Sequence, residues 1–111
     1  MTDETAYKIL TAPQFAALRA GCFEGAPVDV ADGYIHLSTA AQLDETLAKH
    51  FAGQEGLVIA AVALAPLGDA LRWEVSRGGA LFPHFYGRLE MRHVSAYVAL
   101  RRDAQGRAVL P

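Results

Sequence analysis

Three polar side chains suited to ligand or proton chemistry alternate along one short segment of the chain. Tyr34, His36 and Ser38 are separated by single apolar residues, a period of two that predicts a strand with these side chains on one face. Thr39 follows at once and, with Gln42 three residues later, forms the pattern of a capping box at a helix start. Such a helix start offers free N–H groups and the positive end of the helix dipole. We therefore expect His36, Ser38 and Thr39 to hold a phosphate or carboxylate, the alternative being a half-buried histidine and a purely structural cap.

A second group of reactive side chains lies in residues 81–87, which have the sequence LFPHFYG. The proline fixes its own backbone angle and restricts the residue before it, which predicts an interruption of any regular strand. His84 and Tyr86 are candidates for proton transfer, and Phe82 for contact with a ligand ring. The alternative is an aromatic loop that packs over the sheet.

A carboxylate and two guanidinium groups occur close together in residues 72–77. Glu74 is predicted on the polar face of a strand, and Arg77 in the glycine-containing loop that follows. We expect Glu74 to act as a catalytic carboxylate, Arg77 to bind an anion and Trp73 to stack on a ligand ring. The alternative is a surface ion pair, which contributes little stability.

The sequence signatures of metal sites and phosphate-binding loops are absent. His36, His50, His84 and His93 lack the short spacing of zinc ligands, and Cys22 is the one cysteine. No glycine-rich phosphate loop occurs. We therefore expect no tightly bound metal, which leaves a metal-dependent hydrolase as a minor alternative. Cys22 is expected to be a small buried residue.

The composition excludes several kinds of partner. The formal net charge is −2 and the basic residues are scattered, so the chain lacks the basic stripe that a nucleic-acid partner requires. The longest apolar run, residues 57–65, is too short to span a bilayer, and the N-terminus does not resemble a signal peptide. We expect a cytoplasmic protein with a small anionic or nucleotide ligand, and the oligomeric state stays open.

The order of the predicted elements favours an α+β fold. Helices are predicted at 12–20 and 39–53, and strands at 6–10, 34–38, 57–64, 71–75 and 94–100. The apolar run at 57–64 predicts a central strand buried on both faces. Residues 24–33, which contain Glu24, Asp29 and Asp32, are interpreted as a solvated loop. Because the helices come early and the strands late, we predict one compact domain over 1–111, with a split, mostly antiparallel sheet and two main helices.

Segments spread along the chain resemble the bacterial domain of unknown function 952 family. They are Tyr7-Lys-Ile9, Asp32-Gly-Tyr-Ile-His-Leu-Ser-Thr39, Gln42-Leu43, Arg72-Trp-Glu74 and Phe82-Pro-His-Phe-Tyr-Gly87, within about residues 6–101. This family is similar in fold to the ADP-ribosyltransferase superfamily, in which a split-sheet α+β domain cradles NAD. The resemblance therefore implies a nucleotide-binding cleft, with NAD as the candidate cofactor.

The resemblance also implies roles for single residues. Lys8 would take the first-strand position and pair with negative charge on the ligand, and Ser38–Thr39 would form the second element. The Glu-x-Glu pattern that usually supplies the third element is absent, so Glu74, Glu90 or the 82–87 segment would have to replace it. We therefore expect no NAD hydrolysis at a rate typical of dedicated enzymes.

Two classes of function are compatible with these patterns. One is a nucleotide- or anion-binding site with NAD-dependent transferase chemistry, and the other is a non-catalytic ligand-binding or protein-interaction module. We predict that His36, Ser38, His84 and Tyr86 border one shared cleft, in which the two histidines orient the ligand or move protons. Product formation from NAD would separate the two classes.

Overall fold

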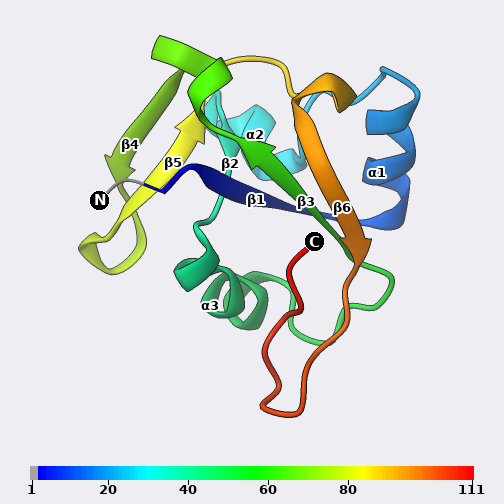
Figure 1. The fold of residues 1–111 in the computed structure, drawn as a ribbon. Coiled ribbons are helices and arrows are strands. Elements are labelled where there is room, and N and C mark those ends of the chain that lie inside the picture. The colour runs from blue at the N-terminus through cyan, green and yellow to red at the C-terminus, as the bar shows by residue number, and fades with distance from the viewer. Residues whose placement is uncertain (1–2) are drawn as a thin grey trace.

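Figure 1 shows how the helices and strands of the chain are arranged. The computed structural model describes residues 3–111, and the side chain of Arg77, a predicted anion-binding group, lies outside the described part. In chain order the elements are β1 (Thr5–Leu10), α1 (Ala12–Arg19), α2 (Pro27–Asp32), β2 (Ile35–His36), α3 (Ala40–His50), β3 (Val58–Ala63), β4 (Leu71–Val75), β5 (Leu81–Phe85) and β6 (Val94–Ala99). Short 3-10 turns at Ala65–Ala70, Arg77–Gly79 and Met91–His93 precede the last three strands.

The strands form two three-stranded antiparallel sheets. Their orders are β1-β3-β6 and β2-β5-β4. Tyr7 and Ser38 link the sheets by exchanging both backbone hydrogen bonds, at 2.8 Å and 2.9 Å. This bridge joins β1 to the chain just after β2. The prediction of an α+β domain with a split antiparallel sheet is therefore confirmed at this level.

The apolar run predicted as a central strand is β3. It pairs with β1 on one side and with β6 on the other. The side chains from Ile59 to Val62 are buried, because helices or loops cover both faces of this sheet. The predicted burial on both faces is confirmed.

Two capped helices cover the opposite faces of the β1-β3-β6 sheet (Figure 1). Both begin with a capping box, formed by a threonine and by a glutamine three residues later, as the sequence predicts for α3. Leu47 of α3 belongs to the core cluster of Ile9, whereas Leu18 of α1 belongs to that of Leu10. Because successive strand residues point to opposite faces, α1 and α3 lie on opposite sides of β1.

The segment 24–33, predicted as a loop, contains the short helix α2. Its proline stands in the first turn, where no N–H is needed. The side chain of Asp29 accepts the amide N–H of Ala26 at 2.8 Å, which satisfies one free donor of this turn. Gly33 ends the helix in the left-handed conformation, with φ of 86°. The loop prediction was therefore wrong for 27–32.

Strand β5 runs through Pro83, which the sequence predicted to interrupt it. The carbonyl of Pro83 accepts the amide N–H of Leu37 at 3.2 Å. Because the N–H and C=O of one strand residue point to the same side, the missing N–H faces the end of β2 and not β4. β2 itself stops at His36, two residues before the predicted end of this strand. The proline therefore shortens β2, whereas β5 stays continuous.

Two further observations concern the surface of the molecule. Cys22, predicted to be buried, is exposed in the turn after α1. Among residues 3–111, no helix has the length and apolar character that a membrane crossing requires.

Candidate functional site

A cleft of about 620 Å³ is lined by residues of β1, β2, β5, α2 and α3. Its volume lies within the range of small-molecule sites. The predicted site residues that line it are Lys8, His36, Ser38, Phe82 and His84. The structure thus brings side chains from both polar segments of the sequence to one cavity.

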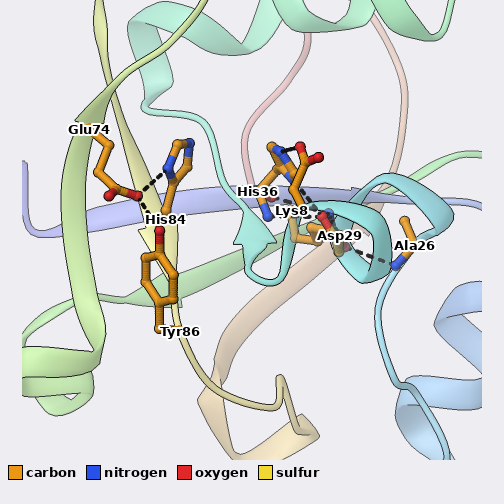
Figure 2. Close-up of polar contacts among 8 residues, drawn as sticks. Lys8, Ala26, Asp29, His36, Glu74, His84 and Tyr86 are labelled. Carbon is orange, nitrogen blue, oxygen red and sulfur yellow. Dashed lines mark hydrogen bonds and ion pairs between the residues drawn. The ribbon is translucent and has the colours of Figure 1, made fainter.

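His84 is oriented by the carboxylate of Glu74 (Figure 2). Glu74 lies diagonally across from His84 on the neighbouring strand β4. Its Oε1 lies 2.8 Å from His84 Nδ1 and accepts the hydroxyl of Tyr86 at 2.7 Å. The hydrogen bond from His84 and then that from Tyr86 lower the pKa of Glu74. Because an ionised carboxylate only accepts, Nδ1 carries a proton, and Nε2 is the nitrogen directed away from Glu74.

The exposed side chain of Tyr86 donates a hydrogen bond to the same carboxylate. Its hydrogen bond to Glu74 raises the pKa of the Tyr86 hydroxyl, and the guanidinium of Arg72 lies 4.8 Å from the centre of its ring. Tyr86 is not among the residues that line the cleft. It therefore reaches His84 through Glu74, and does not border the cleft as the sequence analysis predicted.

Asp29 is buried and accepts four hydrogen bonds, although the sequence interpretation placed it in a solvated loop. The Lys8 ammonium lies 2.8 Å from Oδ2, and the backbone N–H and ring Nδ1 of His36 lie 3.0 Å and 2.7 Å from Oδ1. The amide of Ala26 is the fourth donor. Burial alone would raise the pKa of Asp29, but the bonds from His36 and the charge of Lys8 outweigh it and lower the pKa to about 2.

Lys8 is buried beside Asp29 and also donates to the carbonyl of His36 at 3.1 Å. Burial lowers the pKa of Lys8, whereas the charge of Asp29 acts in the opposite direction. Lys8 was predicted to pair with negative charge on a ligand. In the structure its charge is already compensated by Asp29.

Two tyrosine rings form one cluster with the two histidines. The Tyr34 ring stacks on the His84 ring at a centroid distance of 4.0 Å and lies 4.6 Å from that of His36. The two imidazoles are 5.5 Å apart, since His36 and His84 are cross-strand partners of β2 and β5. Tyr86 is 5.2 Å from Tyr34. Burial and then the nearby carboxylates, that of Asp32 first, raise the pKa of Tyr34.

The helix start at Thr39 is closed by its own capping box. The Thr39 hydroxyl accepts the amide of Gln42, and the Gln42 side chain accepts the amide of Thr39. Thr39 does not line the cleft. Ser38 does, but its hydroxyl lies 3.0 Å from that of Thr46. Of the predicted helix-start site, Ser38 therefore shares the cleft with the two histidines, whereas Thr39 does not.

The remaining predicted residues take structural positions. Trp73 is half-buried and packs against the larger core cluster, away from the cleft lining. Phe82 is buried and contributes an apolar wall to the cleft. Within the described chain, no three His, Cys, Asp or Glu residues are arranged to hold a metal ion.

Asp29 was not predicted as a site residue. The signal that could have found it is Lys8, a lysine within a strand whose neighbours Ile9 and Leu10 are apolar. A buried lysine requires a partner, and a carboxylate supplies one.

Comparison with known proteins adds a family and one solved relative. The crystal structure of protein CC0527 from Caulobacter crescentus is similar to this chain, with 48% sequence identity and a TM-score of 0.85, over 95% of this chain and 93% of that one. The solution NMR structure of CC0527 gives 48% identity and a TM-score of 0.80, over 95% and 91%. No curated protein matches the chain. Residues 9–97 match a family model, which confirms the family resemblance noted in the sequence: the chain belongs to the family described as "Protein of unknown function (DUF952)".

Proposed function

We propose that the cleft binds a small nucleotide or other anionic ligand and that His84 transfers a proton on it. One observation carries this proposal: His36 and His84, each held by a carboxylate, lie on adjacent strands and line the same cavity. Imidazoles that are fixed by carboxylates are well suited to proton transfer near neutral pH.

The hydrogen bonds indicate different roles for Glu74 and His84. Glu74 holds the His84 proton at Nδ1, which leaves Nε2 as the basic nitrogen. Glu74 thereby acts through His84 and is not itself part of the cleft wall. Phe82 offers an apolar surface for a base or another ring.

The more specific version of this proposal is that the bound ligand is NAD and the reaction a transfer from it. The two antiparallel three-stranded sheets, with helices early in the chain, agree with the ADP-ribosyltransferase likeness that the sequence motifs suggest. Lys8 stands on the first strand, as that likeness implies, but Asp29 neutralises it. The chemistry would then depend on the Glu74–His84 pair in place of a Glu-x-Glu element.

A non-catalytic ligand-binding module is the second candidate. It is favoured by the Ser38 hydroxyl, which is engaged with Thr46 and lacks a described bond to either histidine. A cleft of this kind would hold a ligand without presenting an activated serine nucleophile of its own.

Isothermal titration calorimetry with NAD, ADP-ribose, AMP and inorganic phosphate tests the binding proposal. We expect His84→Gln and His36→Gln to weaken binding about tenfold or more, because each replaces an imidazole that a carboxylate holds in the cleft. His93→Gln is the matched control, since His93 does not line the cleft. Absence of heat with every compound, or equal affinity in all four proteins, would contradict the proposal.

A nicotinamide-release assay then separates the two candidates. Release by the wild type that is abolished in Glu74→Gln would establish an NAD-cleaving enzyme. Binding of NAD without release from either protein would establish the binding module for this ligand.

A further inference from the structure

Both ring nitrogens of His36 face carboxylate oxygens. Nδ1 lies 2.7 Å from Oδ1 of Asp29, and Nε2 lies 3.0 Å from Oδ2 of Asp32. A neutral imidazole has one N–H, so one nitrogen would direct a lone pair at a carboxylate oxygen that also offers only lone pairs. An imidazolium donates from both nitrogens. The two contacts are therefore satisfied together only when the ring carries two protons.

We propose that Asp29 and Asp32 are positioning residues that hold His36 as an imidazolium at neutral pH. Both come from α2, which ends at Gly33 and returns the chain to β2 beside them. The short helix thereby places two carboxylates around one ring.

The charges that surround His36 support this assignment. Lys8 shares Asp29 with the ring, and its positive charge opposes a second cation. Two carboxylates and one ammonium leave one negative charge, which the imidazolium compensates. Glu74 is directed at His84 instead, so it does not contribute an acceptor to His36.

The rings that contact His36 are compatible with a cation. The centre of the Tyr34 ring lies 4.6 Å from that of His36, within the range of favourable cation–π contacts. The His84 ring is 5.5 Å away and edge-on. The N–H of His84 at Nδ1 donates to Glu74, so this N–H is not directed at His36.

The consequence for the ligand rests on the proposed function, whereas the charge of His36 does not. The cleft combines a donor-only histidine with His84, whose Nε2 accepts. A fitting ligand carries an oxyanion, either carboxylate or phosphate, and a hydroxyl or amine that donates to His84. The side chain of Asp32 is 45% exposed, so an entering oxyanion can replace it at Nε2 of His36.

The ring nitrogens can be observed directly in the full chain without any ligand. In protein labelled with ¹⁵N in histidine, at pH 7.5, we expect both nitrogens of His36 to show the signals of protonated positions. Asp32→Asn replaces the charged acceptor at Nε2, and the proton on Nε2 should be lost. Glu24→Gln is the matched control: it removes the same charge from the same segment, and His36 should keep both protons.

Testing the role of Asp29 requires a variant that still folds. Asp29→Asn alone would leave the buried Lys8 without a counter-charge, so Lys8→Met is combined with it. We expect His36 to lose its second proton in this double variant as well. A singly protonated His36 in the wild type, or the same signals in Asp32→Asn and Glu24→Gln, would overturn the assignment. Failure of every ligand to bind, with both His36 protons present, would instead overturn only the proposed function.

Discussion

The carboxylate of Asp29 shows how one residue can organise a site. Its donors come from β1, from β2 and from the residue before α2. Lys8 indicates that a carboxylate partner exists but not which one, and an aspartate among acidic and turn-forming residues is usually solvated. The histidines were predictable, since His36 and His84 stand in segments rich in polar and aromatic side chains. Their partners depend on strand register, which single-residue patterns do not specify.

The Lys8–Asp29 pair predicts strong coupling between two substitutions. Asp29→Asn should lower the free energy of unfolding by about 3–5 kcal/mol, because it leaves the buried Lys8 ammonium without its counter-charge. Lys8→Met should lower it less, because Asp29 keeps the hydrogen bonds from His36 and Ala26. The double variant should lose less than the sum, as urea unfolding of the four proteins would show. The exposed pair Lys49 and Glu45, at 3.5 Å, is the control and should couple by less than about 1 kcal/mol. Additive losses at Lys8 and Asp29 would disprove the coupling.

Asp29 also predicts how stability depends on acid. Its pKa is about 2 in the folded protein and 3.8 for the unperturbed group, so the unfolded state binds its proton first as the pH falls. The stabilisation is complete above pH 3.8 and is lost as the pH falls through this value towards about 2. The difference amounts to about 2 kcal/mol.

Urea unfolding between pH 5 and pH 2 measures this loss. The Lys8→Met/Asp29→Asn variant serves as the reference, because the other carboxylates are common to both proteins. Parallel curves for the two proteins would show that Asp29 contributes nothing to acid sensitivity.

At the scale of elements, local patterns predicted what local forces decide. The capping box at Thr39 and the apolar run of β3 are short-range features, and both are present in the structure. Two of the elements that were predicted wrongly, α2 and β5, depend on distant contacts. α2 is stabilised by a carboxylate that Lys8 and His36 hold in place, and β5 accommodates Pro83 because β2 has already ended.

The side-chain amide of Gln42 connects α3 to the β4–β5 hairpin. We therefore expect its replacement to lower the stability of the protein. Its Oε1 accepts the amide of Thr39 at 3.0 Å, and its Nε2 donates to the carbonyl of Leu81 at 2.7 Å. Gln42→Glu keeps the capping acceptor but loses the donor, so stability should fall by about 1 kcal/mol.

The matched control for this prediction is Gln14→Glu. Gln14 accepts the amide of Thr11 in the equivalent capping box of α1, and the change should be nearly neutral. Chemical denaturation compares the two variants. Equal losses would show that the bond to Leu81 contributes no stability.

At the scale of the whole molecule, the two sheets share one hydrophobic core. Leu10 and Val62 of the first sheet lie in the same cluster as Ile35 and Phe85 of the second. This continuity predicts a single cooperative unfolding transition. Trp73, the one tryptophan, lies in β4 and reports on the second sheet by fluorescence, whereas far-ultraviolet circular dichroism reports on both. The two transitions in urea should coincide, and separate midpoints would mean that the sheets unfold independently.

The exposed position of Cys22 has a practical consequence. The chain has one cysteine and one tryptophan, so an acceptor dye on the thiol would form a single energy-transfer pair with Trp73. The thiol follows α1 and the indole lies in β4, and neither residue lines the cleft. Energy transfer between them would report changes in the spacing of these two parts during titration with a ligand. This distance can thus be followed in the natural sequence without any substitution.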